Sequence, residues 1–243
     1  MQVASAIDTL KMSDTPAKKI DFSSVDKENT YKAIVGIPDL DVEEVDEVDK
    51  KFHSVAPTIK PEEADADTRE VYDGVRKQWG RISNFSQVLA HQPAALAGWM
   101  LPNAAIRLDN VKSDPDYVKI QQLVIIKTSA LNQSAYCMSH NVPLGKKLGL
   151  TEAQIKAAQG SDYMSSPDLD ERQKAAIRWA DVVTQMQARD DDAAFAAMKD
   201  HFSEKQIVEL TVFCGMWNYS NRLCEALHVD LERPDKRIEF QQK

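Results

Sequence analysis

The chain has few cysteines and few glycines for its length. Only three of its 243 residues are cysteine and eight are glycine. An odd number of cysteines scattered through a large domain does not make the disulfide framework of small secreted proteins. No two of them have the spacing of a zinc ribbon. We therefore expect three free thiols.

Positive charge and long apolar runs are also scarce. Thirty basic residues face thirty-eight acidic ones, which gives a net charge of −8 at neutral pH. Binding to nucleic acid needs clustered Lys and Arg to neutralise phosphates, so this balance argues against a nucleic-acid partner. The first twenty residues hold no long apolar run, and no stretch reaches the roughly 18 apolar residues of a membrane span. These absences predict a cytoplasmic protein with no membrane partner.

The histidines show no metal-binding pattern. The chain has five of them: His53, His91, His140, His201 and His228. No two have the helical spacing of paired metal ligands. We therefore expect neither a metal ion nor any other cofactor.

The two ends of the chain differ in composition. Residues 39–50 hold seven acidic residues and one lysine, which cannot form a core, whereas the chain as a whole is 43% hydrophobic. We predict an acidic N-terminal extension over residues 1–55 and a helical domain over residues 56–243. Valines recur every third residue in the acidic segment, so both a short surface helix and a solvated arm stay open.

After Pro61 the sequence favours helices, because Ala, Leu, Glu, Lys and Gln are abundant and alternating β-branched segments are rare. We expect helices near 64–79, 93–109, 116–132, 134–148, 151–159, 168–188, 191–201 and 203–227. Three capping boxes mark helix starts: Thr151 with Gln154, Asp168 with Glu171, and Ser203 with Gln206. Gly149 and Gly160 mark helix ends, since glycine adopts the left-handed conformation at little cost.

One stretch carries most of the information, QQLVIIKTSALNQSAYCMSHNVPLGKKLGLTEAQI over residues 121–155. It resembles the core motif of the carboxymuconolactone decarboxylase and AhpD-like (alkylhydroperoxidase-like) family. Residues 61–93 and 202–232 are similar to the family's entry helices and last long helix. The resemblance implies an all-α AhpD-like fold, with a central antiparallel helix pair over 116–148 and helix 203–227 packed across it. It also implies a homo-oligomer, a trimer or a hexamer.

The core motif departs from the family's redox pattern. Peroxidase members of the family carry two cysteines three apart, assisted by an upstream Glu and a downstream His. Here Ser134 and Cys137 stand at the two cysteine positions, Gln122 at the Glu position and Asn141 at the His position, with His140 one residue earlier. A serine cannot form a disulfide, a glutamine cannot take a proton and an asparagine does not titrate. The resemblance therefore implies that this chain has lost the cycle in which the family's two cysteines alternate between thiols and a disulfide.

The remaining groups suggest a catalytic cluster in one helical turn. Ser134 fits the N-cap position, which places Cys137 in the first turn near free backbone amides. A helix terminus alone lowers a thiol pKa from about 8.5 to only around 8, so a second cation is needed, and His140 follows three residues later. We predict Cys137 and His140 as the catalytic pair, with Ser134 and Tyr136 as hydroxyl donors. The alternatives are a buried structural cysteine, a structural histidine and a serine that only caps.

Six further residues are candidates for substrate binding: Gln122, Asn141, Asn218, Arg222, His91 and Trp99. Arg222 could receive a carboxylate, although structural pairing with an acid is an equally open reading. Trp99 could line a cavity mouth, although an aromatic side chain at helical spacing is more often part of the core. Cys214 and Cys224 lie ten apart on one predicted helix, too far to bond each other, and we predict that they serve packing.

Three functions follow from these residues. The first is a cofactor-free lyase or isomerase of the decarboxylase type that acts on a small organic acid or lactone, with Arg222 or a nest of backbone amides holding the carboxylate and His140 moving a proton. The second is a one-cysteine peroxidase that oxidises Cys137 to a sulfenic acid and is reset by an outside thiol. The third is a non-catalytic scaffold whose acidic extension binds a basic partner. We rank the lyase first.

Overall fold

The structure is a computed structural model and describes residues 55–232, which form helices and no β-strand. The helices in chain order are α2 (Ala66–Trp79), α3 (Asn84–Leu89), α4 (Pro93–Ser113), α5 (Pro115–Leu131), α6 (Ala135–Lys147), α7 (Glu152–Gln159), α8 (Glu171–Thr184), α9 (Asp192–His201) and α10 (Glu204–Ala226), with a 3-10 turn η2 (Tyr163–Ser165) before α8. The prediction of an all-α fold is confirmed.

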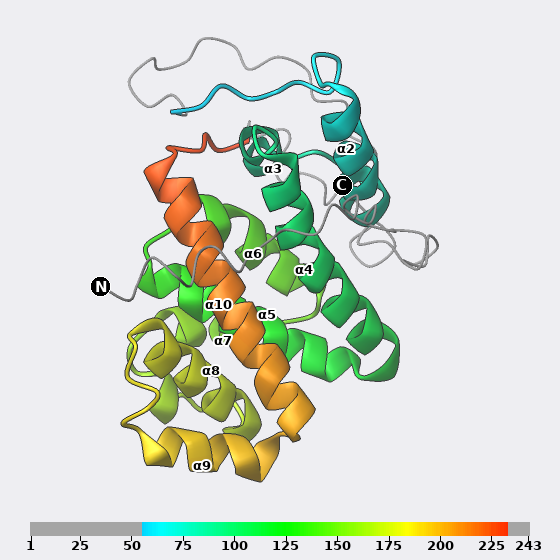
Figure 1. Cartoon of the computed structure of the whole chain (residues 1–243). Coiled ribbons are helices and arrows are strands. Elements are labelled where there is room, and N and C mark those ends of the chain that lie inside the picture. The colour runs from blue at the N-terminus through cyan, green and yellow to red at the C-terminus, as the bar shows by residue number, and fades with distance from the viewer. Residues whose placement is uncertain (1–54, 233–243) are drawn as a thin grey trace, which may run out of the picture.

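Helix α5 is the centre of the molecule. It packs against α4, α6, α7, α8 and α10 (Figure 1). Its residues Val124, Ile125 and Ile126 have no exposed surface, as expected for a helix with apolar residues all round. A short loop turns the chain from α5 into α6, and α10 packs on both helices. The predicted central pair with the last long helix across it is therefore confirmed.

Local capping chemistry sets most of the helix ends. The predicted boxes at Thr151 and Ser203 are both present. The box predicted at Asp168 is wrong, because the reciprocal pair is Asp170 with Gln173, and α8 therefore begins at residue 171. Both aspartates are acceptable N-caps with a partner three residues later, and the pair that forms is Asp170 with Gln173: the Gln173 N–H donates to Asp170 Oδ1 at 2.7 Å, and the Asp170 N–H donates to Gln173 Oε1 at 3.2 Å.

Two further features differ from the prediction. Gly149 has a φ of +91° and ends α6 in the left-handed region, whereas Gly160 has a φ of −80° and ends α7 in extended backbone. Helix α3 was missed, because its six residues are too few to show a helical period. Ser83 caps it by accepting from the backbone N–H of Ser86 at 3.2 Å.

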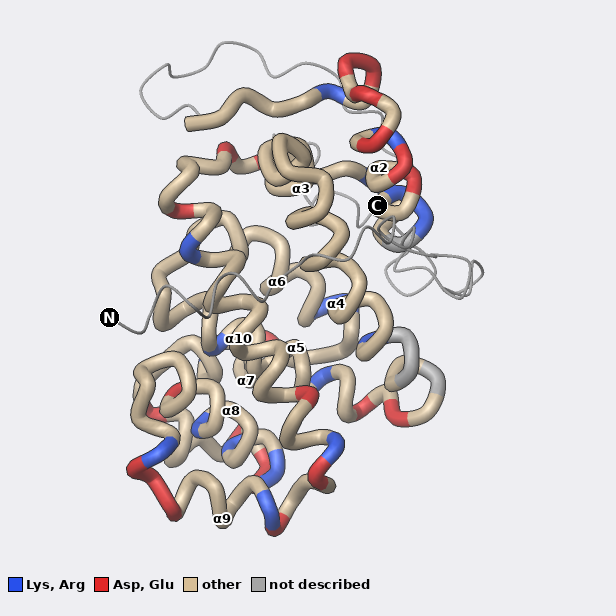
Figure 2. Tube along the Cα trace, in the orientation of Figure 1, with Lys and Arg blue, Asp and Glu red and all other residues tan. Residues whose placement is uncertain are grey.

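The apolar residues form a large core and a smaller one. The large core joins residues of α2, α3, α4, α5, α6, α8 and α10. The smaller one lies where α5, α7 and α8 meet and includes Leu123, Ile126, Leu150, Ile155 and Ile177. Figure 2 shows the charged residues mainly along α2 and around α8 and α9, with few between them. The acidic segment 39–50 lies outside the described residues.

A helix that crosses a membrane must be both long and apolar. Across residues 55–232, no helix combines the length and the apolar character that a bilayer crossing requires.

Candidate functional site

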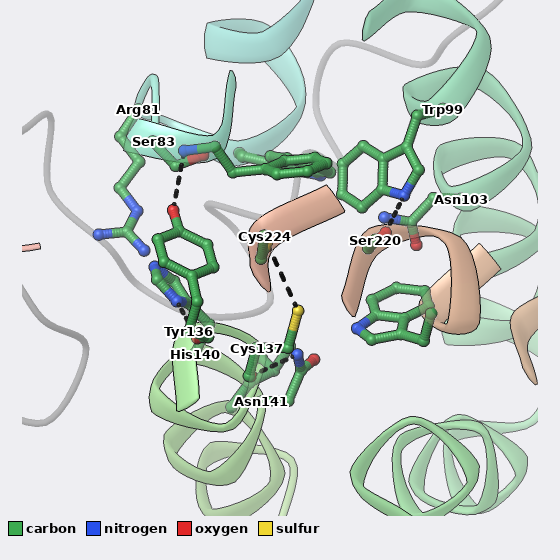
Figure 3. A pocket seen from close by; sticks show the side chains of 14 residues that line it. Arg81, Ser83, Trp99, Asn103, Tyr136, Cys137, His140, Asn141, Ser220 and Cys224 are labelled. Atoms are coloured by element: carbon green, nitrogen blue, oxygen red, sulfur yellow. Dashed lines mark hydrogen bonds between the residues drawn. The ribbon is translucent and has the colours of Figure 1, made fainter. Parts of the chain in front are cut away.

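A cavity of about 110 Å³ opens where α6 and α10 meet α4 and the segment from the end of α2 to α3 (Figure 3). Its wall is largely aromatic, made by Trp79, Phe85, Trp99, Tyr136 and Trp217. The polar lining is formed by Arg81, Ser83, Asn103, His140, Asn141 and Ser220, and two sulfurs come from Cys137 and Cys224. A space of this size holds a ligand about as large as a single small ring.

Trp99 organises the aromatic wall. Its ring centroid lies 4.9 Å from that of Trp79 and 5.0 Å from that of Phe85, both in edge-to-face arrangements. Its indole N–H donates to the Ser220 hydroxyl at 2.6 Å. Since a buried Trp N–H needs a partner, this bond fixes the ring orientation. Trp99 therefore lies in the cavity wall, and its predicted role in substrate binding stays a prediction.

Two cysteines from different helices meet at the cavity. Cys137 lies in the first turn of α6 and Cys224 in the last turn of α10, and their Sγ atoms are 4.0 Å apart (Figure 3). The Cys224 thiol lowers the pKa of Cys137 by hydrogen bonding to its thiolate. Burial opposes this effect, and the Ser134 hydroxyl adds to it. The Cys224 pKa is raised by the same bond and by burial. Of the two thiols, Cys137 is therefore the one that more readily becomes a thiolate, and Cys224 is its hydrogen-bond donor.

The start of α6 differs from the prediction in one respect. Ser134 is the N-cap residue, but its side chain makes no capping hydrogen bond. The hydroxyl is fully buried, and its influence is on the neighbouring thiol, where it lowers the pKa of Cys137. Ser134 therefore acts on the thiol and not on the helix amides.

His140 does not bond to Cys137, although both side chains line the same cavity. Its Nε2 lies 2.8 Å from Glu232 Oε2, and its Nδ1 lies 3.0 Å from the Tyr136 carbonyl oxygen. Both ring nitrogens are therefore held by groups other than the Cys137 sulfur, and the predicted catalytic pairing of His140 with Cys137 stays a prediction. The side chain of His140 leaves α6 toward the segment that follows α10, because Glu232 holds it there.

Glu232 is the centre of a buried polar network. Its Oε1 accepts from the Tyr136 hydroxyl at 2.7 Å and from the Asn84 backbone N–H at 2.9 Å. Burial by itself raises the pKa of this carboxyl, but the charges of His140 and Arg81 and the bonds from His140 and Tyr136 lower it to about 2. The same surroundings raise the pKa of Tyr136 well above its usual range, burial first and the Glu232 charge second. Glu232 is therefore a carboxylate at neutral pH.

A second chain of hydrogen bonds lies behind the cavity at the family's Glu and His positions. The Gln122 amide donates to Asn141 O at 2.8 Å and to Asn141 Oδ1 at 3.1 Å. Asn141 in turn donates to the Cys137 carbonyl oxygen at 2.8 Å. The Arg107 guanidinium donates to Gln122 Oε1 at 3.0 Å. Gln122 is fully buried behind Asn141, which reaches the cavity wall, so this chain positions the first turn of α6.

Three predicted binding residues lie away from the cavity. Arg222 is exposed and donates to Asn218 O at 3.0 Å and to Asn218 Oδ1. Asn218 in turn donates to the Thr184 hydroxyl. His91 is exposed and bonds to the Pro57 carbonyl oxygen at 2.7 Å. None of the three lines the cavity. Asn218 and Arg222 lie on another side of α10, and His91 lies in the turn between α3 and α4. Their predicted binding roles stay predictions to which this cavity adds no support.

Sequence reasoning missed three groups at the site, namely Cys224, Glu232 and Arg81. Cys224 was predicted to serve packing only, yet it lines the cavity and contacts Cys137. No local pattern marks these residues, because each is brought in by a separate segment. Cys214, on the same helix as Cys224, does serve packing, with its sulfur near Thr128 and the Ala180 carbonyl.

No protein-family model matches the chain. The uncharacterised protein YdfG of Bacillus subtilis (strain 168) is 26% identical over 111 residues, which cover 44% of this chain and 72% of YdfG. A solved structure from Agrobacterium tumefaciens, of unknown function and provisionally assigned as the antioxidant defence protein AhpD, is 25% identical. It covers 60% of this chain and 95% of its own, with a TM-score of 0.52. The chain has the AhpD-like fold.

Two further solved structures share this fold with the chain at lower sequence identity. The AhpD core of an uncharacterised peroxidase-related protein from Ralstonia eutropha JMP134 is 19% identical, with a TM-score of 0.62, covering 74% of this chain and 92% of its own. The debrominase Bmp8 is also 19% identical, with a TM-score of 0.58, covering 72% of this chain and 90% of its own. At these identities the likeness is one of fold, and related folds host different reactions.

Proposed function

We propose that the protein is a thiol peroxidase that reduces a small, largely apolar hydroperoxide at Cys137. The observation that carries the proposal is the Cys137 sulfur in the cavity wall, with two hydrogen-bond donors that favour its thiolate. A thiolate, not a thiol, is the nucleophile toward peroxide. The peroxidase-related AhpD-like neighbours point in the same direction.

The proposed step uses groups of this chain. The Cys137 thiolate attacks the terminal oxygen of ROOH, the O–O bond breaks, and the sulfur becomes a sulfenic acid. The RO⁻ leaving group takes a proton and departs as an alcohol. His140, held by Glu232 in the same cavity, can deliver that proton, and water replaces it afterwards. Atoms and electrons balance, because the sulfur loses the two electrons that the peroxide gains.

The aromatic wall supports an organic substrate over hydrogen peroxide. Trp79, Phe85 and Trp99 offer an apolar surface to an alkyl or aryl group. Burying one such group stabilises a complex by about 1.5–3 kcal/mol, which is roughly a tenfold to hundredfold preference. We expect cumene hydroperoxide to give a kcat/KM at least about tenfold above that of hydrogen peroxide.

The lyase hypothesis has less support. It needs Arg222 or a nest of backbone amides to hold a carboxylate while His140 moves a proton, and Arg222 is bound to Asn218 outside the cavity. Arg81 is the cation that lines the cavity, and the nearby Glu232 carboxylate offsets its charge. An anionic substrate would therefore meet a carboxylate as well as a cation.

The test is the consumption of cumene hydroperoxide by the full chain with dithiothreitol as reductant. Cys137→Ala should lower the rate by about a hundredfold or more, because it removes the nucleophile. Cys214→Ala is the matched control, a buried cysteine on α10 away from the cavity, and should stay within about twofold of the wild type. If Cys137→Ala keeps the wild-type rate, the protein is not a peroxidase of this kind.

A further inference from the structure

The sequence places a serine where the family's first redox cysteine stands, yet the structure brings a different cysteine to the site. Cys224 lies 87 residues after Cys137 in the chain, with its Sγ 4.0 Å from Cys137 Sγ. Both sulfurs line the cavity, and both side chains are nearly buried, at 6% exposure for Cys137 and 3% for Cys224. Figure 3 shows the two side chains directed toward each other from α6 and α10.

From this juxtaposition we propose that Cys224 is the resolving cysteine, which closes a Cys137–Cys224 disulfide after each turnover. The inference rests on the peroxidase chemistry proposed above. It concerns the step that follows peroxide reduction, in which the sulfenic acid on Cys137 is converted back to a thiol. The sequence alone suggested an outside thiol for this step, whereas in the structure the last turn of α10 supplies the second thiol.

The step balances without a further oxidant. The Cys224 sulfur attacks the sulfenic sulfur of Cys137, the S–S bond forms and the S–O bond breaks. The oxygen leaves as water, which carries the thiol proton and the sulfenic proton. An external dithiol then returns both cysteines to thiols by two exchange steps and is itself oxidised to a disulfide.

The helix positions permit the movement that bonding requires. A disulfide has an S–S distance of about 2.05 Å, so the sulfurs must approach by about 2 Å. Cys137 is the third residue of α6, and Cys224 is the third from the end of α10. Terminal turns fray and shift more readily than helix interiors. Neither helix therefore needs to move as a whole.

The electronic arrangement also suits this division of roles. The thiol with the lowered pKa attacks the peroxide, and its partner stays protonated until the sulfenic acid has formed. Once Cys137 is oxidised, its thiolate no longer accepts a hydrogen bond from Cys224 and no longer raises the Cys224 pKa. The oxidation of the first sulfur thus prepares the second one to react.

Cys214 provides an internal control for this inference. It lies on the same helix, is fully buried and has a pKa raised by burial. Ten residues of α-helix separate it from Cys224 by about 15 Å along the axis. Its sulfur is near Thr128, Thr184 and the Ala180 carbonyl, away from Cys137. It should remain a thiol throughout turnover.

The experiment treats the reduced full chain with one equivalent of cumene hydroperoxide, blocks the remaining thiols with iodoacetamide and weighs the intact protein. The wild type should lose two hydrogen atoms and take up a single blocking group, on Cys214. Peptide mapping should give a cross-link between Cys137 and Cys224. Cys214→Ser should lose the same two hydrogens and take up none.

Cys224→Ser is the decisive variant, because its hydroxyl keeps a hydrogen-bond donor beside Cys137 but cannot form a disulfide. It should gain one oxygen atom on Cys137, trapped by dimedone. Its steady-state turnover at low dithiol should fall about tenfold or more, because the sulfenic acid must then wait for an outside thiol.

The outcomes separate the two proposals. If the wild type accumulates a sulfenic acid on Cys137 and forms no cross-link, the peroxidase proposal stands and the resolving role of Cys224 is overturned. A cross-link to Cys214 would overturn it as well. If neither the wild type nor Cys224→Ser gains oxygen or loses hydrogen at Cys137, the peroxidase proposal fails and the inference falls with it.

Discussion

Two parts of the molecule bury a charged side chain in different ways. In the smaller core, Lys127 of α5 is 2% exposed, and its Nζ donates to the Gly160 carbonyl at 2.9 Å. The same nitrogen lies 3.5 Å from Asp181 Oδ2 and 4.4 Å from the centre of the Tyr163 ring. Burial lowers the Lys127 pKa, and the Asp181 charge opposes this shift. Lys127 does not line the cavity described above.

Glu232, beside the cavity, is also buried but has a different setting. Its partners Tyr136 and His140 both line an open space, and that space also holds the two sulfurs. The comparison teaches that burial and a shifted pKa do not by themselves mark a functional group. A cavity beside the group is the additional requirement, because a substrate must reach it. The smaller core serves stability, and the Glu232 network serves stability and the site together.

The largest expected effect comes from the smaller core. Lys127→Ala should lower the free energy of unfolding by roughly 3–5 kcal/mol, because Asp181 loses its buried partner. Urea unfolding measures this change. Lys127→Met is the control, since it keeps the volume of the side chain and should cost less than Lys127→Ala.

The folded Lys127→Ala protein should still oxidise Cys137 at the wild-type rate. A slower oxidation in the folded variant would show that the smaller core and the cavity are coupled. It would contradict the view that the smaller core serves stability alone.

The next effect is the pH dependence that Glu232 gives to stability. Its folded pKa of about 2 lies below the ordinary value of 4.5. The carboxylate therefore stabilises the fold above pH 4.5, and this contribution of about 3 kcal/mol is lost as the pH falls toward 2. Glu232→Gln cannot titrate, so its unfolding free energy should fall less steeply between about pH 5 and pH 3. Urea unfolding at several pH values measures the slope, and equal slopes in the two proteins would contradict the assignment.

A smaller effect is expected from the tyrosine hydroxyls in the two regions. Tyr136→Phe removes a bond to the Glu232 carboxylate and an acceptor for the Phe85 N–H, and should cost about 1–3 kcal/mol. Tyr163→Phe removes one bond to Asp181, and should cost about 0.5–1.5 kcal/mol.

Thermal or urea unfolding of these two variants compares the regions directly. Only Tyr136→Phe should also change the rate of peroxide reduction. An equal change in Tyr163→Phe would contradict the distinction.

The smallest effect on stability accompanies a change in thiol reactivity. Cys224→Ala removes the hydrogen bond that lowers the Cys137 pKa, and should cost only about 1 kcal/mol of stability. The pH profile of Cys137 alkylation by iodoacetamide should move to higher pH, since the thiolate loses its main donor. Cys224→Ser keeps a donor and should move the profile less. A profile unchanged in Cys224→Ala would show that the pair is not electronically linked.

The helices and the order in which they occur follow from the sequence. Capping at Thr151 and Ser203, the left-handed Gly149 and the apolar run of α5 are local features that act within a few residues. The same local rules place Cys137 in the first turn of α6. They also explain the error at Asp168, where two neighbouring aspartates offered alternative caps.

Tertiary structure alone decides which groups meet at the site. Cys224 reaches Cys137 and Glu232 reaches His140 because α10 packs across α6 and the chain then turns back at His228, which has a φ of +50°. Arg222 lies only two residues before Cys224, yet it is exposed, since two residues rotate a side chain by about 200° around the helix axis. The local rules that form a helix do not determine which of its sides faces the neighbouring helix. That rotation is set by packing between segments far apart in the chain.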